Sequence, residues 1–247
     1  MSRKTDTKEE VRTVTSNDFI TAYGLDTMSL KARKLLYVAI SQCRKDDREF
    51  FEYEISVPEF ADLMGIKPTN VYQESRKICL ELTRTCISLE PTNKRGCEIY
   101  TLFSYCKIVD GQGRTFKLNP DMTSFFLNLK KSFTQPLLAD FLKMRSQYSM
   151  EIWHLMQREM HSKKPGMRNT ITFDLSLNEL RKVTGTESKF KQVGQFKEKV
   201  LDKAIREIWD NCGVEISYQN IKIGRTVVGF RFTSKSIFYL GEKEIKA

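Results

Sequence analysis

The chain has 247 residues, of which 40% are hydrophobic, and it carries 41 basic and 31 acidic side chains, a formal net charge of +10. This length suits one large domain or two of modest size with packed cores, and the basic surplus favours a polyanionic partner, either nucleic acid or an anionic membrane surface. No apolar run approaches the roughly 18 residues that a membrane-spanning helix needs, and the charged segment 1–12 lacks the apolar core of a signal peptide, so we expect a cytoplasmic protein without a membrane partner.

The first half begins with a polar segment, residues 1–14, which we expect to be a flexible tail. Ser29 is an N-cap candidate for an amphipathic helix, and Ser56 and Glu59 have the spacing of a capping box. Gly65 then ends a short helix. The predicted elements of the first domain, residues 15–133, are helices at 16–23, 29–40, 56–65, 70–84 and 121–131, and strands at 51–55, 86–89, 98–109 and 114–118.

The sequence Thr-Gln-Pro at 134–136 breaks the pattern, and we place the domain boundary there. The second domain therefore covers residues 134–240, and residues 241–247 are expected to be a C-terminal tail. Its predicted elements are helices at 136–145, 149–161, 176–184 and 194–210, a strand at 171–174, and a hairpin of strands at 214–218 and 226–232. The order of short helix, turn, long helix and hairpin is the same in both halves.

One short pattern occurs twice, as Glu-Phe-Ala-Asp-Leu-Met-Gly at 59–65 and as Glu-Leu-Arg-Lys-Val-Thr-Gly at 179–185. After a short polar gap, each copy is followed by a longer helical segment rich in Lys, Arg and Gln. A short helix joined by a turn to a longer one is a helix-turn-helix, whose second helix can enter the DNA major groove. A hairpin with a basic tip then forms a wing. The sequence therefore predicts an α+β protein of two tandem, pseudo-symmetric winged-helix domains.

The long helices separate an apolar face from a polar face. At 100° per residue, the inward positions of the second helix are Phe196, Val200, Leu201, Ala204, Ile205 and Ile208, and those of the first helix are Val71, Ser75, Ile78, Cys79 and Leu82. The outward faces carry Lys and Arg, which suit guanine or phosphate, and Gln, which suits adenine. An ordinary solvated face is the alternative interpretation.

The candidate DNA-binding residues come from these outward faces, the helix starts, the turn before the second long helix and the wing tips. In the first domain they are Thr69, Asn70, Gln73, Arg76, Lys77, Arg84, Lys94 and Arg95. In the second domain they are Lys189, Lys191, Gln192, Gln195, Lys199, Lys203, Arg206, Lys222 and Arg225. Asp202 lies on the same outward face of the second helix.

Three stretches of the chain are similar to the replication initiator proteins of iteron plasmids. They are Thr-Ser-Asn-Asp at 15–18 with Leu-Lys-Ala-Arg-Lys-Leu-Leu at 30–36, the helix pair at 142–153, and the apolar spine at 196–208. The likeness covers roughly residues 15–235. Trp153 stands where the family usually has Tyr, and Lys199 lies near a position where it often has Arg, which would offer a bidentate fork to a base.

The resemblance implies two winged-helix domains that bind one directly repeated site, an iteron, on double-stranded DNA. It also implies a monomer that binds iterons, helps to open the origin and recruits the host initiator and helicase. A dimer would bind an inverted repeat at its own promoter and repress it. These partners are implied by the resemblance alone.

Two other classes of function stay open from the sequence. One is a two-domain transcriptional repressor without a replication role, and the other is a nuclease or primase-like enzyme. Against an enzyme, His154 and His161 lack the spacing and neighbours of a metal site, and the chain has no phosphate-binding loop of the GxxxxGK[ST] type. The six cysteines follow no metal spacing. We therefore expect no catalytic residues, no metal and no cofactor.

Overall fold

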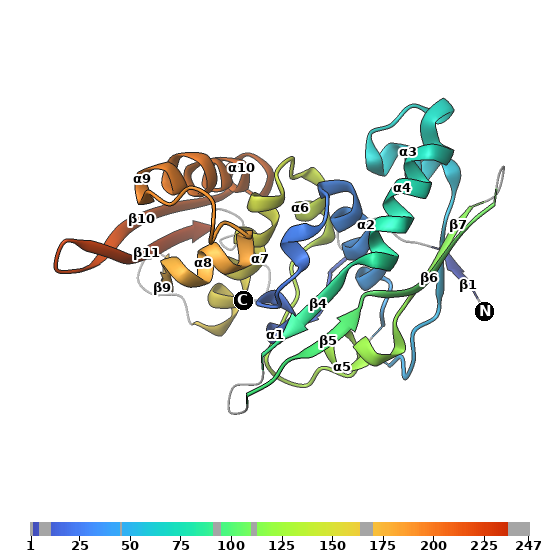
Figure 1. Ribbon diagram of the computed structural model, residues 1–247, viewed down its shortest axis with the longest axis horizontal. Helices are drawn as coiled ribbons and strands as arrows, with labels where there is room; N and C mark the ends of the chain where they lie inside the picture. Colours follow the sequence, from blue (N-terminus) through green and yellow to red (C-terminus); the bar gives the residue numbers. More distant parts are fainter. Residues whose placement is uncertain are drawn as a thin grey trace, which may run out of the picture. The chain divides into compact units, whose positions relative to one another are not determined.

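The structure is a computed structural model that describes residues 2–4, 11–44, 46–90, 95–109, 113–163 and 170–236. Its contacts divide the chain into two units, residues 1–142 and 143–247 (Figure 1). The boundary expected at 133/134 lies inside the first unit. Phe133 and Thr134 pair there with Thr15 and Ser16, and the ring of Phe141 stacks on Tyr37 with centroids 4.1 Å apart.

In its described residues, the first unit combines short helices with three small sheets. Its helices are α1 (Asn17–Ile20), α2 (Leu30–Ser41), α3 (Val57–Met64), α4 (Val71–Arg84), α5 (Thr123–Phe126) and α6 (Leu138–Lys143), with 3-10 turns η1 (Leu25–Thr27), η2 (Pro68–Asn70) and η3 (Pro120–Met122). Its strands are β1 (Ser2–Lys4), β2 (Thr15–Ser16), β3 (Glu52–Ile55), β4 (Cys86–Leu89), β5 (Glu98–Thr101), β6 (Phe103–Ile108), β7 (Arg114–Leu118) and β8 (Phe133–Thr134). The sheets have the orders β1-β3-β7-β6, β2-β8 and β4-β5.

The tail predicted for residues 1–14 is not a free tail where the structure describes it. Strand β1 pairs in parallel with β3. Further on, the Thr13 N–H donates to the carbonyl of Pro136 at 2.9 Å, and the Val11 carbonyl accepts from the N–H of Leu138 at 2.8 Å. Backbone hydrogen bonds of this kind need no side-chain pattern, so the polar composition of the segment does not reveal them.

The helix predicted at 121–131 is also shorter than expected. It ends at Phe126, and Asn128 and Ser132 then take left-handed backbone angles, with φ of 54° and 53°. Such angles interrupt a right-handed helix. The chain instead runs on into strand β8. The other predicted helices and strands of this unit are present, with ends that shift by a few residues and with 98–109 divided into β5 and β6.

A buried arginine links the long helix of the first unit to its sheet. Arg114 on β7 is 2% exposed. Its Nε donates to Ser75 Oγ on α4 at 2.9 Å, and its guanidinium lies over the ring of Phe60 on α3, 5.8 Å from the centroid. A charged group away from water is tolerated when it is bonded in this way. Arg114 therefore helps to fix both helices of the first helix-turn-helix.

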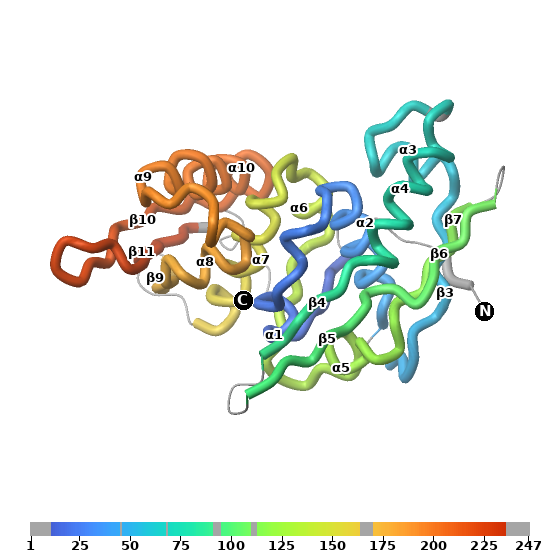
Figure 2. Tube along the Cα trace, in the orientation of Figure 1, coloured from blue at the N-terminus to red at the C-terminus, as the bar shows by residue number. Residues whose placement is uncertain are grey.

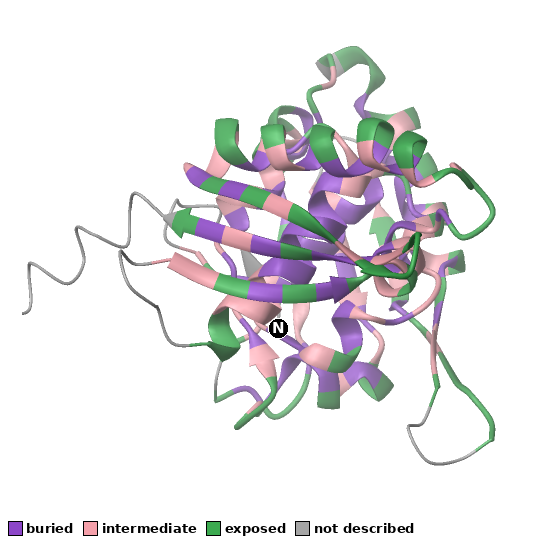
Figure 3. Cartoon of the chain, turned by 90° about the vertical axis from the view of Figure 1, so that its left-hand side faces the viewer, coloured by how far each residue is buried: buried purple, intermediate pink, exposed green. Residues whose placement is uncertain are grey.

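The second unit is built around one buried helix. Its elements are α7 (Gln147–Ser162), β9 (Thr170–Ser176), α8 (Leu177–Thr184), α9 (Val193–Phe196), the π-helical turn η5 (Lys197–Leu201), α10 (Asp202–Cys212), β10 (Val214–Ile223) and β11 (Thr226–Ser236). Helix α7 buries eight consecutive residues, 149–156. The antiparallel sheet has the order β10-β11-β9, and buried and exposed residues alternate along its strands (Figure 3). The sheet and helices therefore share one core.

We expect Arg114→Met to destabilise the protein by about 2 kcal/mol. The substitution removes the buried N–H that donates to Ser75 Oγ, while methionine keeps most of the apolar part of the side chain. Urea unfolding measures this change in the free energy of unfolding. Arg84→Met, at the exposed end of α4, is the matched control and should stay within about 0.5 kcal/mol of wild type. Equal stabilities for the two variants would contradict the role assigned to Arg114.

Candidate nucleic-acid interface

The repeated sequence pattern forms the same local structure in both units. Ser56 caps α3 in a full capping box with Glu59, and the Ser176 hydroxyl caps α8 by accepting from the N–H of Glu179 at 3.0 Å. Both helices end at a glycine in the left-handed region, Gly65 with φ 60° and Gly185 with φ 59°. This backbone angle is one that a side chain with a Cβ rarely adopts. The two short helices therefore start and stop as the sequence predicted.

The first recognition helix, α4, presents the predicted faces. Its inward residues Val71, Ser75, Ile78, Cys79 and Leu82 are all buried. The candidates Thr69, Asn70, Gln73, Arg76, Lys77 and Arg84 are all exposed. Two apolar side chains, Tyr72 and Leu80, are exposed on the same helix, and neither is among the DNA-binding residues predicted from the sequence. The helix therefore offers solvent a face that is basic and partly apolar.

The second recognition element is not one regular helix. The short helix α9 and the longer helix α10 are joined by the π-helical turn η5, so the segment predicted as a single helix at 194–210 contains a wider turn. Phe196, Val200, Ala204 and Ile208 are spaced by four residues, and all are 0% exposed. In a regular α-helix, residues four positions apart point about 40° away from each other around the helix axis. A wider turn reduces this rotation. The π turn thus helps to keep one apolar face on the core.

The opposite side of this element carries the predicted polar residues. Gln192, Gln195, Lys199, Lys203 and Arg206 are exposed, and so are Lys189 and Lys191 in the preceding turn. Figure 2 follows the chain from α8 through this turn into α9 and α10. Of the inward residues, Ile205 alone is half-buried rather than buried. The faces predicted from periodicity are therefore present despite the π turn.

The two hairpins have the positions expected of wings. Strands β4 and β5 pair directly after α4, and Arg95 before β5 is exposed, whereas Lys94 lies outside the described residues. In the second unit, β10 and β11 form a longer hairpin whose end projects beyond α9 (Figure 1). Lys222 and Arg225 are exposed at that end, on either side of Gly224 with φ 59°.

Acidic side chains lie among the basic candidates. Lys199 Nζ contacts Glu198 Oε1 at 2.6 Å, and this hydrogen bond lowers the pKa of Glu198. In the first unit, hydrogen bonds from Lys31 and then Lys77 lower the pKa of Glu74. The carboxylates therefore stay charged at neutral pH, and each contacts at least one exposed lysine.

A tyrosine of the wing joins it to the second recognition element. The Tyr218 hydroxyl on β10 donates to Asp202 Oδ1 at 2.6 Å, and Lys197 Nζ lies 5.2 Å from the centre of the Tyr218 ring. Partial burial, with the hydrogen bond to Asp202, raises the pKa of the Tyr218 phenol. The phenol thus remains a donor at neutral pH, and Asp202, which the sequence placed on an open face, contacts the wing strand.

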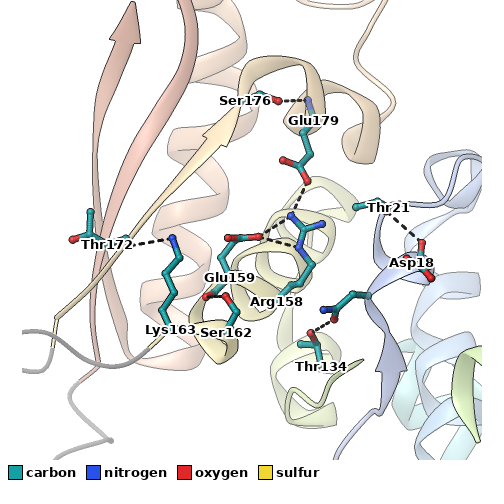
Figure 4. A network of polar contacts seen from close by, with 11 residues as sticks. Asp18, Thr21, Thr134, Arg158, Glu159, Ser162, Lys163, Thr172, Ser176 and Glu179 are labelled. Carbon is teal, nitrogen blue, oxygen red and sulfur yellow. Dashed lines mark hydrogen bonds and ion pairs between the residues drawn. The ribbon is translucent and has the colours of Figure 1, made fainter. Parts of the chain in front are cut away.

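A network of ionic contacts holds α8 against α7. Arg158 Nη2 lies 2.7 Å from Glu179 Oε1 on α8 and 2.8 Å from Glu159 Oε1 on its own helix (Figure 4). These side chains are between 17% and 29% exposed. Charge-assisted hydrogen bonds in a partly buried setting are stronger than those on the surface. The network therefore ties the first helix of the second helix-turn-helix to the core helix.

The described residues offer neither a metal site nor a membrane-spanning helix. No group of three or more His, Cys, Asp or Glu side chains is arranged to hold a metal ion there. His154 is buried in α7, and exposed His161 contacts the carbonyl of Gln157 through Nδ1 at 2.8 Å. Within the same residues, no helix has the length and apolar character needed to cross a membrane.

A helix-turn-helix followed by a hairpin in each unit defines a tandem winged-helix protein of the α+β class. Models of the initiator replication protein match both parts, the WH1 model over residues 12–157 and the WH2 model over residues 176–234. The chain belongs to this family of replication initiator proteins. The structure is also similar to a crystal structure of the Pi initiator protein in complex with iteron DNA, with a TM-score of 0.75 and 20% identity over 92% of this chain and 98% of that one. At this identity, the likeness shows a shared fold.

We expect the Arg158–Glu179 pair to have a coupling energy of about 1–2 kcal/mol in a double-mutant cycle of Arg158→Met and Glu179→Gln, because both groups are largely shielded from water. Urea unfolding of the four proteins gives this energy. The bidentate Arg231–Asp174 pair, with side chains 58% and 46% exposed, is the control and should couple by less than about 1 kcal/mol. A larger coupling in the exposed pair would contradict the structural role of the network.

Proposed function

We propose that this protein initiates plasmid replication by binding directly repeated iterons in double-stranded DNA as a monomer. The observation that carries the proposal is the pairing, in each unit, of an outward basic recognition face with a wing. The iteron complex of the structurally similar Pi initiator supports DNA of this kind as the ligand. The DNA-contacting residues are those predicted from the sequence, with Lys94 included on sequence grounds alone.

A chain with two winged-helix units, each able to contact DNA, favours a long binding site that is directly repeated. Major grooves on one side of a duplex recur about every 10.5 base pairs, so contacts from both units would extend over roughly two turns. Tethering raises the effective concentration of the second reader once the first is bound. Several phosphate contacts make the affinity fall steeply with salt.

The protein has further proposed roles, all of which it would carry out by binding and not by catalysis. The monomer would recruit the host initiator and helicase to the opened origin in the cytoplasm, and a dimer would repress its own promoter at an inverted repeat. Family membership supports these roles. Incubation with supercoiled DNA and Mg²⁺ or Mn²⁺ tests the absence of catalysis, since nicking would contradict it.

Footprinting of the full-length protein on the DNA that flanks its gene tests the central claim. We expect protection of tandem repeats of about two helical turns, and a plasmid that carries those repeats should replicate only when the protein is supplied. Protection of a promoter alone, without replication, would instead support a two-domain repressor.

We expect Arg206→Ala to weaken binding to the protected repeat by about 1–3 kcal/mol, with little change for a mixed-sequence duplex, because a base contact carries specificity. Titration of both duplexes by fluorescence anisotropy measures this. Lys235→Ala, which removes an exposed charge near the other end of β11, is the control. An unchanged affinity of Arg206→Ala for the repeat would remove Arg206 from the base-reading residues.

The wing residues should act differently, through phosphate. We expect Lys222→Ala and Arg225→Ala each to weaken binding to all sequences and to reduce the slope of log K against log salt by about 1. Titrations at several salt concentrations give the slope. A loss of discrimination between sequences without a change in slope would indicate that these residues contact bases and not phosphates.

A further inference from the structure

One side chain spans the turn that leads into the second recognition element. This turn, residues 185–192, separates α8 from α9. The guanidinium of Arg181 on α8 donates to four backbone carbonyls. Its Nη1 donates to the carbonyls of Thr186 and Lys189, each at 2.9 Å. Its Nη2 donates to the carbonyls of Phe190 at 2.8 Å and Lys191 at 3.2 Å. Four of the last six carbonyls before Gln192 therefore point at one group.

The turn would not hold this shape by local preference alone. Phe190 has a φ of 49°, in the left-handed region, where a bulky residue is strained and persists only if its surroundings hold it. The Phe190 carbonyl accepts from Arg181, and its ring contacts Tyr148 edge-on, with centroids 6.5 Å apart. Arg181 is therefore one of the groups that keep this conformation.

The same guanidinium also contacts the recognition element. It lies 5.0 Å from the ring centroid of Phe196, and Phe196 is 0% exposed at the end of α9. Its helix α8 is in turn tied to the core helix α7 by the Arg158–Glu179 pair. A continuous series of contacts thus runs from the core through Arg181 to the turn and to α9.

The first unit holds its turn in another way. Both turns begin with the same backbone bonds, from the N–H of Ile66 to the carbonyl of Ala61 at 3.0 Å and from the N–H of Thr186 to the carbonyl of Arg181 at 2.9 Å. The position equivalent to Arg181 is therefore Ala61, which has no donor side chain. The chain there continues through the 3-10 turn η2 directly into α4. The guanidinium bridge belongs to the second unit.

We propose that Arg181 is a positioning residue for DNA recognition, which acts through the backbone of the turn and not by touching DNA. By fixing residues 186–191, it sets the places of Lys189 and Lys191 and the entry angle of the second recognition element. This inference rests on the proposed function for its DNA consequence. Its structural part, the bridge itself, stands without DNA.

The test uses full-length Arg181→Lys, which keeps the charge but replaces a planar fork of five donors by one ammonium. Amide hydrogen exchange of the DNA-free protein is the structural measurement. We expect the bonded amides of Thr186 and Lys189 to exchange about tenfold faster, as local opening becomes easier. Amides of the buried helix α7 are the internal reference and should be unchanged. Arg231→Lys, the same replacement on β11, is the matched control.

The DNA measurement uses a duplex selected by the wild-type protein from a random library, and a mixed-sequence duplex of equal length. We expect Arg181→Lys to bind the selected duplex about tenfold more weakly, within the cost of a displaced base contact. Because the charge is kept, its affinity for the mixed-sequence duplex should change less than about twofold. Arg231→Lys should match wild type on both.

Each result has a distinct meaning. Unchanged exchange at Thr186 and Lys189, or equal acceleration in α7, would overturn the local bridge. Faster exchange in the turn with undiminished affinity for the selected duplex would overturn the positioning role. If the wild-type protein selects no sequence, the proposed function fails and the positioning role fails with it, while the exchange data still decide the bridge.

Discussion

The requirement that each recognition helix bury one side on its own unit is the constraint on which the rest of the structure depends. Helix α4 and the α9–α10 segment each bury one apolar face in the core, and this burial is the main source of stability for an amphipathic helix. The opposite face is thereby turned to solvent. The basic side chains proposed to meet DNA are thus oriented by apolar residues that are buried on the other side of the same helix.

Sequence patterns predicted the features that depend on neighbouring residues. The cap at Ser56, the stop at Gly65 and the two faces of each long helix follow from spacing over a few positions, and the structure confirms them. The pairing of β1 with β3 and the extension of the first unit to residue 142 depend on backbone and ring contacts between distant segments. No local pattern encodes such contacts. The same holds for Arg181, whose sequence position resembles that of any exposed helical arginine.

The two units reach the same architecture with different supports. In the first, Arg114 bonds Ser75 from within the core and lies over Phe60. In the second, Arg158 joins α7 to α8, and Arg181 spans the turn. In each case a planar guanidinium with several donors connects segments that are separate in the sequence. Likeness of sequence pattern between the halves therefore does not extend to the groups that fix their geometry.

Acidic groups on the recognition faces bear on how such a surface would discriminate between DNA sequences. Glu198 pairs with Lys199, and Glu74 pairs with Lys77, so a phosphate that approached either lysine would come close to a carboxylate. Exposed pairs of this kind are weak, but the carboxylates also repel phosphate at every sequence. Local repulsion of this kind lowers the affinity for every sequence, and base contacts restore it only at the correct site, which favours specific over non-specific binding. The mixture of charges, more than the basic surplus, suits a protein that must find a few repeats among many competing sites.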